Sequence, residues 1–223
     1  MLESREALIL EVLKKLPEDV VLVGGYAVNA YVPPRFSIDC DLVVLGEVTE
    51  VERILVESGF EETEKADVPY GGFARFMHKG ENVSFDLLLN SMLDRDSGIV
   101  FDGDLFKKYS KERFTVGRAS PIRIKMRIAD PELIFAVKFV SARRQDIRDI
   151  FMLAGTKLNW SLVKEIIRKE CTEELIRERV KLIEARVTGG DYRDSLQGAF
   201  GKIPDKAFDD CSSNLVRFLD DLT

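Results

Sequence analysis

The 223-residue sequence has few of the residues on which thiol, disulfide and histidine chemistry depend. It contains one histidine, His78, so a histidine-rich zinc site and a Ser-His-Asp triad are both poor explanations of its function. Its three cysteines, Cys40, Cys171 and Cys211, are odd in number and far apart, so they predict neither a disulfide framework nor a metal-binding pair. A reducing compartment, the cytoplasm, is therefore the expected location.

The sequence also lacks any segment that predicts insertion into a membrane. Residues 1–16 have no basic region followed by a long apolar core and are typical of an amphipathic helix, and no later apolar run could span a bilayer. The net charge of −6 provides no overall attraction to nucleic acid or to an anionic membrane. We therefore expect no membrane partner, and a nucleic-acid partner would have to bind a local basic patch.

The pattern of apolar residues divides the chain at about residue 130. The first part predicts a small mixed sheet with helices, and 90–120 is less regular. Helices are predicted at 4–16, 26–32 and 48–59, and strands at 20–23, 37–45, 72–80, 82–90 and 121–130. The second part predicts only helices, at 131–143, 146–154, 160–170, 173–187 and 205–221. We predict an α+β fold with a catalytic-type domain at 1–130 and a helical bundle at 131–223.

Two carboxylates lie inside the predicted strand at 37–45. Asp39 and Asp41 are two residues apart and share one face of the strand, while Cys40 points to the opposite face. Asp86 repeats the pattern among the apolar residues of the strand at 82–90. Like charges so close must be offset by arginine or lysine partners or by a divalent cation, and Mg²⁺ or Mn²⁺ suits carboxylate oxygens.

Gly24 and Gly25 follow the first strand and begin a short helix. Backbone N–H groups at such a position can bind a phosphate, although a plain tight turn explains a Gly-Gly pair equally well. Neither GxGxxG nor GxxxxGK[ST] is present, which excludes the Rossmann and Walker loops. Together with the carboxylates, the pair indicates metal-assisted phosphoryl chemistry.

The stretch VGGYAVNAYVPPRFSIDCDLVV resembles the signature of the nucleotidyltransferase superfamily, which has the DNA polymerase beta-like fold. Gly-Gly, then Arg-x-Ser-x-Asp-x-Asp about a dozen residues later, matches in order and spacing. Six positions carry the match, Gly24, Gly25, Arg35, Ser37, Asp39 and Asp41, and Asp86 fits the third carboxylate. The later DPELIFAVKFVSARRQDIRDIFML is similar to the AbiEii-like branch, minimal bacterial and archaeal transferases that include toxins of toxin–antitoxin pairs.

The resemblance implies a role for each matching residue. Asp39 and Asp41 would hold Mg²⁺ or Mn²⁺ against the triphosphate of an NTP such as ATP, and Asp86 would complete a second metal site and help to activate the acceptor. Gly24 and Gly25 would bind the β- and γ-phosphates. Ser37 would contact the triphosphate, and Arg35 would orient the loop or a phosphate.

In the second part of the chain, the branch carries a lysine and an Arg-Asp pair. Lys138 matches the lysine, a further triphosphate contact, and Arg148-Asp149 matches the pair; a second aspartate is expected near position 152, where this chain has Met152. Arg143 and Arg144 are candidates for a phosphate or acceptor contact.

Two other features have competing interpretations. Arg123, Lys125 and Arg127 alternate with apolar residues, so they form either a solvated strand face or a binding site for an anionic acceptor such as tRNA. Tyr70-Gly71-Gly72 predicts a hairpin turn or a loop near the site.

We therefore predict a nucleotidyltransferase that transfers a nucleoside monophosphate to an acceptor and releases pyrophosphate. The acceptor is open among tRNA, a protein side chain and a small molecule, and an antitoxin is a possible partner. Two alternatives use the same residues differently: a non-catalytic, antitoxin-like scaffold of the same fold, and a metal-dependent phosphohydrolase.

Overall fold

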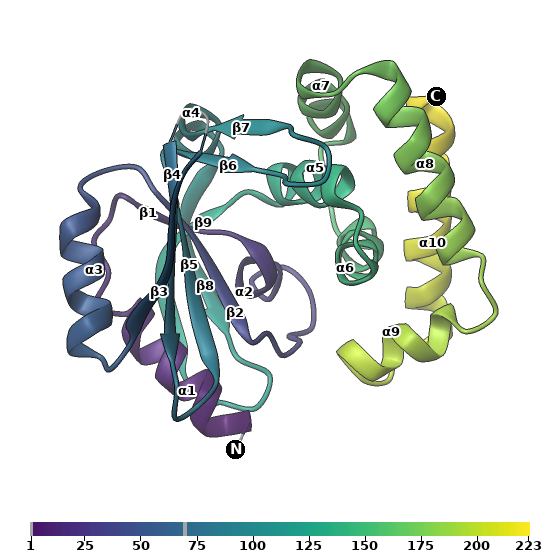
Figure 1. The fold of residues 1–223 in the computed structure, drawn as a ribbon. Coiled ribbons are helices and arrows are strands. Elements are labelled where there is room, and N and C mark those ends of the chain that lie inside the picture. Colours follow the sequence, from purple (N-terminus) through teal and green to yellow (C-terminus); the bar gives the residue numbers. More distant parts are fainter. Residues whose placement is uncertain (1, 69–70) are drawn as a thin grey trace. The chain divides into compact units, whose positions relative to one another are not determined.

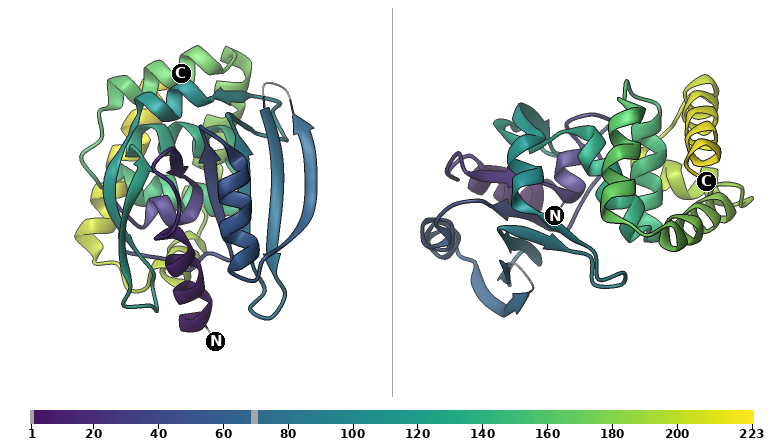
Figure 2. Two further views of the ribbon diagram at one scale, coloured as in Figure 1. Left: turned by 90° about the vertical axis from the view of Figure 1, so that its left-hand side faces the viewer. Right: turned by 90° about the horizontal axis from the view of Figure 1, so that it is seen from above.

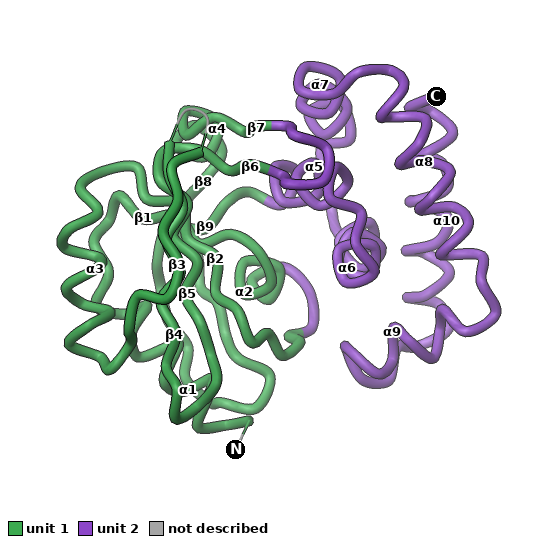
Figure 3. The backbone as a smooth tube through the Cα atoms, viewed as in Figure 1, with its two compact units in different colours: residues 1–30, 34–93, 100–130 green, residues 31–33, 94–99, 131–223 purple. Residues whose placement is uncertain are grey.

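The computed structural model describes residues 2–68 and 71–223, which form two compact units (Figure 3). Unit 1 comprises residues 1–30, 34–93 and 100–130, and unit 2 comprises 31–33, 94–99 and 131–223. Tyr70 lies outside the described residues; Gly71 and Gly72 begin a strand. No helix in the described ranges is long and apolar enough to cross a membrane.

Within the described residues, unit 1 is built on a seven-stranded mixed sheet in the order β3-β4-β5-β2-β1-β9-β8 (Figure 1). Its strands are β1 (Val20–Leu22), β2 (Asp39–Val44), β3 (Glu61–Val68), β4 (Gly71–His78), β5 (Val83–Leu89), β8 (Ser110–Val116) and β9 (Arg123–Ala129). β2 pairs antiparallel with β1 and parallel with β5. A separate small sheet pairs β6 (Ser91–Leu93) with β7 (Val100–Asp102).

Four helices among the described residues accompany the sheet: α1 (Leu2–Leu13), α2 (Gly24–Val28), α3 (Val48–Glu57) and α4 (Gly103–Lys108). Figure 2 shows α1 and α3 on the same face of the sheet. Ile9 and Leu55, on these helices, are fully buried, as the periodicity of apolar residues requires. The central strands are buried as well, which makes them a firm support for any side chain placed on them.

The described part of unit 2 outside its two short segments is helical. It contains α5 (Pro131–Ser141), α6 (Arg144–Ala154), α7 (Trp160–Glu170), α8 (Glu173–Val187), α9 (Tyr192–Phe200) and α10 (Asp205–Leu222). Its core includes an aromatic cluster in which Phe135 and Phe218 meet edge to face, with ring centroids 5.2 Å apart. The predicted helices at 160–170 and 173–187 are confirmed to the residue.

Six elements of the described residues were not predicted from the sequence: β3, β6, β7, α4, β8 and α9. β3 has no apolar alternation, and its residues are exposed or half-buried because it is an edge strand held by its pairing with β4. β8, in the irregular stretch 90–120, is the opposite edge strand and is rich in charge. Edge strands need no buried face, so the period that reveals a half-buried strand is weak in them. α9 also escaped prediction.

Candidate active site

The register of β2 on β5 brings the predicted carboxylates together. Asp41 lies directly beside Asp86, and their neighbours Cys40 and Phe85 are likewise paired. Because residues that are paired across a sheet point to the same face, the carboxylates share one face. Cys40 and Phe85 point to the other, where Phe60 packs edge to face on Phe85 at 5.1 Å between ring centroids. The predicted alternation along β2 is therefore confirmed.

The three carboxylates differ in exposure and in partners. Asp39 is exposed, and its Oδ1 accepts a hydrogen bond of 2.7 Å from the hydroxyl of Ser84, the residue opposite it on β5. Asp41 is half-buried, and Asp86 is buried, with 8% of its surface exposed. Nearby Cys40 is fully buried, and burial, reinforced by these acids, raises the pKa of its thiol, which keeps it an inert core residue.

The glycine pair lies against the same carboxylates. Gly24 has a φ of +63°, and a Cβ at this position would lie 1.8 Å from Oδ2 of Asp41. A Cβ on Gly25 would lie 2.9 Å from both Nη2 of Arg35 and Oγ of Ser37. The motif positions that are spread over 24–41 in the sequence therefore converge in space, and only glycine fits at 24.

The loop that carries Arg35 is held by buried hydrogen bonds. The side chain of Asn29 accepts from the Arg35 backbone N–H at 3.0 Å and donates to the Arg35 carbonyl at 3.0 Å. The Tyr26 hydroxyl donates to the Ser37 carbonyl at 3.2 Å. Arg35 itself is 3% exposed. These contacts support a positioning role for Arg35 in this loop.

Arg75, on β4, is a site residue that the sequence did not reveal. Its Nε and Nη2 donate to Oδ1 and Oδ2 of Asp86, each at 2.7 Å, in a two-point ion pair. The pair follows from the register, because Arg75 lies opposite Asp86. Hydrogen bonding to Asp86 raises the pKa of Arg75 further, so the guanidinium stays charged. In the sequence, the only indication of this pair is that one predicted strand carries an arginine and the next carries an aspartate. The pairing itself can be inferred only when the strand register is known.

The donor set fits a cation at two of the three carboxylates. Within 2–68 and 71–223, no three acidic, histidine or cysteine side chains converge closely enough to hold a metal ion by themselves. Asp39 and Asp41 still suit Mg²⁺, which commonly takes one or two carboxylates and completes its shell with waters and substrate phosphates. Asp86, with both oxygens bound by Arg75, does not fit a metal site in this arrangement.

The predicted site residues of the second part form their own cluster in unit 2. The Nζ of Lys138 on α5 lies 2.8 Å from Oδ1 of Asp146 and 2.7 Å from Oδ2 of Asp149, both on α6. All three side chains are at most 7% exposed. Asp146 and Asp149, three residues apart, therefore lie on one helix face, and both contact Lys138.

The two arginines of this region differ in their contacts. The Nε of Arg143 donates to Oδ2 of Asp146 at 2.9 Å, so Arg143 adds a second cation to the cluster. Arg144 is exposed and lies 3.5 Å from the Ser195 hydroxyl. Burial raises the pKa of Asp146, but Lys138 and Arg143 outweigh it, and the result is a pKa below the ordinary value.

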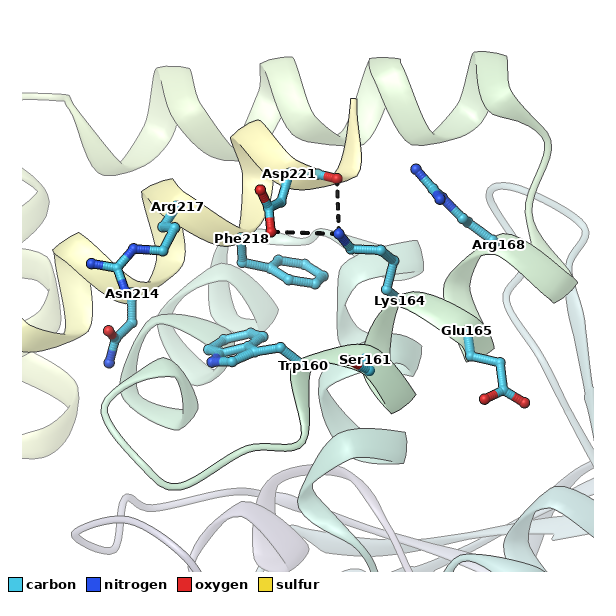
Figure 4. Close-up of a pocket in the computed structure, with 9 residues that line it drawn as sticks. All are labelled: Trp160, Ser161, Lys164, Glu165, Arg168, Asn214, Arg217, Phe218 and Asp221. Atoms are coloured by element: carbon cyan, nitrogen blue, oxygen red, sulfur yellow. Dashed lines mark hydrogen bonds and ion pairs between the residues drawn. The ribbon is translucent and has the colours of Figure 1, made fainter.

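A pocket of about 380 Å³ in unit 2 is lined by α7 and α10 (Figure 4). Trp160 and Phe218 stack there with ring centroids 4.8 Å apart, and Lys164 donates to the Asp221 carbonyl at 3.0 Å. None of the motif residues lines this pocket. We therefore place the candidate active site in unit 1, at Asp39 and Asp41.

No family model matches the sequence, and no curated protein is significantly similar to it. Solved structures are similar in fold. JHP933 from Helicobacter pylori is 17% identical, with a TM-score of 0.51 over 98% of this chain and 92% of that chain. MenT4, a nucleotidyltransferase toxin from Mycobacterium tuberculosis, is 16% identical, with a TM-score of 0.57 over 100% of this chain and 84% of that chain. These likenesses confirm the predicted α+β fold.

Proposed function

We propose that this chain, which has the nucleotidyltransferase fold, is a nucleotidyltransferase that uses an NTP and Mg²⁺ or Mn²⁺. In the reaction, an acceptor oxygen bonds to the α-phosphorus, the bond from that phosphorus to the bridging oxygen breaks, and pyrophosphate leaves. The acceptor hydroxyl gives its proton to solvent water. The observation that carries the proposal is the convergence of Asp41, Gly24, Gly25, Arg35 and Ser37 beside Asp39 and Asp86.

The roles of the residues follow from their positions. Asp39 and Asp41 would hold the cation, which neutralises charge on the triphosphate when bound. The backbone N–H groups of Gly24 and Gly25 and the hydroxyl of Ser37 would bind phosphate oxygens. The left-handed turn at Gly24 keeps this backbone against Asp41.

Asp86 and Lys138 can take the proposed roles only if they first break their present ion pairs. Asp86 would act on the cation or the acceptor only after leaving Arg75, and Lys138 would reach a phosphate only by exchanging its two carboxylate partners. Arg143, Arg144 and Asp149 remain proposed acceptor or phosphate contacts. The likeness to MenT4 supports a toxin role, in which a small antitoxin would be the partner, in the cytoplasm.

The test is transfer of label from α-³²P-labelled NTPs to RNA, protein or aminoglycoside acceptors. Asp41→Asn keeps the shape of the side chain and removes its charge, so transfer should fall by about a hundredfold or more while the melting temperature is retained. Asp67→Asn, an exposed acid on β3, is the matched control and should keep full activity. Equal activity of wild type and Asp41→Asn would refute the assignment, and free NMP as the sole labelled product would indicate a phosphohydrolase.

The Arg75–Asp86 ion pair favours a second candidate, a non-catalytic scaffold. A carboxylate that an arginine neutralises needs no cation, so the third acid of the motif is stable without a ligand. The scaffold predicts no dependence of nucleotide binding on Mg²⁺, whereas the enzyme requires it.

A further inference from the structure

Positive charge is concentrated in one segment of this acidic protein. Residues 107–127 contain eight basic residues and one acidic residue, Glu112, which gives the segment a formal charge of +7. The whole chain carries −6, so the remainder carries −13. Such segregation marks a surface that attracts polyanions locally although the protein as a whole does not.

Most of the segment lies in β8 and β9, at one edge of the sheet (Figure 2), while Lys107 and Lys108 end α4 and Arg118 lies in the loop between the strands. The register places Phe114 beside Lys125, with Arg123 and Arg127 two residues away on either side. Because side chains alternate along the strands, Arg123, Lys125, Arg127 and Phe114 share one face, which we call the basic face. Glu112, opposite Arg127, is the one acidic residue that these two strands place on it.

The basic face combines an exposed aromatic ring with exposed cations. Phe114 is 47% exposed, one of the most exposed large apolar side chains in the described residues. The guanidinium carbon of Arg123 lies 3.8 Å from the centroid of the Phe114 ring. An apolar ring kept at the surface by a cation is the arrangement on which a nucleic-acid base stacks while the cation meets its phosphate.

Internal ion pairs do not cancel this face. Lys125 pairs with Glu112 at 2.7 Å, but both side chains are more than half exposed. Such pairs contribute little to stability and are readily exchanged. The Nη1 of Arg127 donates to the Ser110 hydroxyl at 3.3 Å, and the register places Glu112 opposite Arg127.

We propose that the basic face binds a single-stranded polynucleotide, with phosphates on Arg123, Lys125 and Arg127 and a base stacked on Phe114. The inference rests on the proposed function, since it makes a polynucleotide the acceptor class. β8 is three strand positions from β2, roughly 14 Å, so the bound strand would lie near Asp39 and Asp41 in the same unit. A single strand fits better than a duplex because its bases are free to stack.

The experiment measures fluorescence anisotropy of a short labelled single-stranded RNA over a salt series. The charge reversal Arg123→Glu with Lys125→Glu should weaken binding at least about tenfold and lower the slope of log K against log salt by about 1.4, the value for two lost phosphate contacts. Its matched control is Lys65→Glu with Lys79→Glu, at the opposite edge of the sheet, with the same change of charge. Equal losses in both double variants would overturn the proposal, because they would show only a general charge effect.

The aromatic ring is tested separately. Phe114→Ala should weaken RNA binding by about 5- to 150-fold and leave the salt slope unchanged. Inorganic polyphosphate, which has no bases, should bind this variant as it binds the wild type. Unchanged RNA affinity of Phe114→Ala would overturn the base-stacking site. The same oligonucleotide as DNA tells which sugar is preferred.

The two proposals fail in different ways. Asp41→Asn should bind RNA as the wild type does. If the wild type binds RNA but transfers no nucleotide to any acceptor, the basic face is supported and the nucleotidyltransferase assignment is refuted. If the double variant Arg123→Glu with Lys125→Glu transfers nucleotide to RNA as well as the wild type does, the nucleotidyltransferase assignment is supported and the basic face is refuted as the RNA-binding site.

Discussion

In the candidate site, contacts between neighbouring residues restrict which side chains can be accommodated. Gly24 adopts a left-handed backbone, and the space that a Cβ would fill is taken by the carboxylate of Asp41. Two separate constraints, conformation and volume, therefore act on one residue. They can be distinguished, because Gly98 has a similar φ of +73° with no atom near its Cβ position.

Gly24→Ala should destabilise the protein more than Gly98→Ala. The left-handed backbone alone costs about 1–2 kcal/mol for alanine, and the collision with Asp41 adds about 1–3 kcal/mol at position 24. Chemical denaturation measures both variants. Equal losses would show that Asp41 moves away freely and that the turn does not hold the carboxylate.

Removing Arg75 should release Asp86. Arg75→Met should cost about 1–2 kcal/mol, less than a fully buried charged pair, because Arg75 is 36% exposed. It should also tighten Mn²⁺ binding, since a third carboxylate becomes available beside Asp41. Calorimetric titration with Mn²⁺ measures the change, with Arg53→Met, in an exposed helix pair, as the control. Unchanged Mn²⁺ affinity would show that Asp86 is not a potential ligand.

At the scale of residues, the sequence predicted several of the side chains that the structure brings together at the candidate site. Asp39, Asp41 and Asp86 were identifiable because charge inside an apolar strand is costly and therefore informative. Arg75 was not identifiable, because an arginine on an amphipathic strand is ordinary and its pairing depends on the β4–β5 register. Asp146 was missed for a similar reason: its helix was expected to begin at 146, and its contact with Lys138 crosses two helices.

Among the elements, α5 and α6 are joined by buried charge. Lys138 from α5 lies between Asp146 and Asp149 of α6, and Arg143 contacts Asp146 from outside. Such a cluster fixes the two helices in one register, and Asp146 holds Lys138 and Arg143 fully only while it is ionised.

The stabilisation that ionised Asp146 adds to the free energy of unfolding should be lost at acidic pH. Its pKa is lowered in the folded protein, so its stabilising effect is complete above the ordinary aspartate pKa of about 3.9 and is lost as pH falls through the lower folded value. Urea denaturation of wild type and Asp146→Asn from neutral to acidic pH measures this. The difference in unfolding free energy between the two proteins should shrink toward acid pH, and a constant difference would contradict the lowered pKa.

Element prediction was most accurate for α7 and α8. α7 and α8 have strong start signals, with Asn159 and Thr172 as caps whose side chains accept from backbone N–H groups three residues on. β3 and β8 lack a buried face, and their positions depend on pairing partners distant in sequence. Local pattern therefore predicts interior elements better than sheet edges.

For the whole molecule, net charge describes only an average over the chain. A net charge of −6 argues against nucleic acid, yet residues 107–127 carry +7. The membership of 31–33 and 94–99 in unit 2 was also hidden, because it depends on contacts between distant parts of the chain. The change from mixed to helical pattern near residue 130, in contrast, is readable from periodicity alone.

The central claim is that Asp39 and Asp41 make nucleotide binding depend on a divalent cation. Isothermal titration calorimetry with a non-hydrolysable NTP, with and without Mg²⁺, tests it on the intact chain. We predict binding by wild type and by Asp67→Asn only when Mg²⁺ is present, and none by Asp39→Asn or Asp41→Asn. Equal binding with and without Mg²⁺, or undiminished binding by both aspartate variants, would contradict the account.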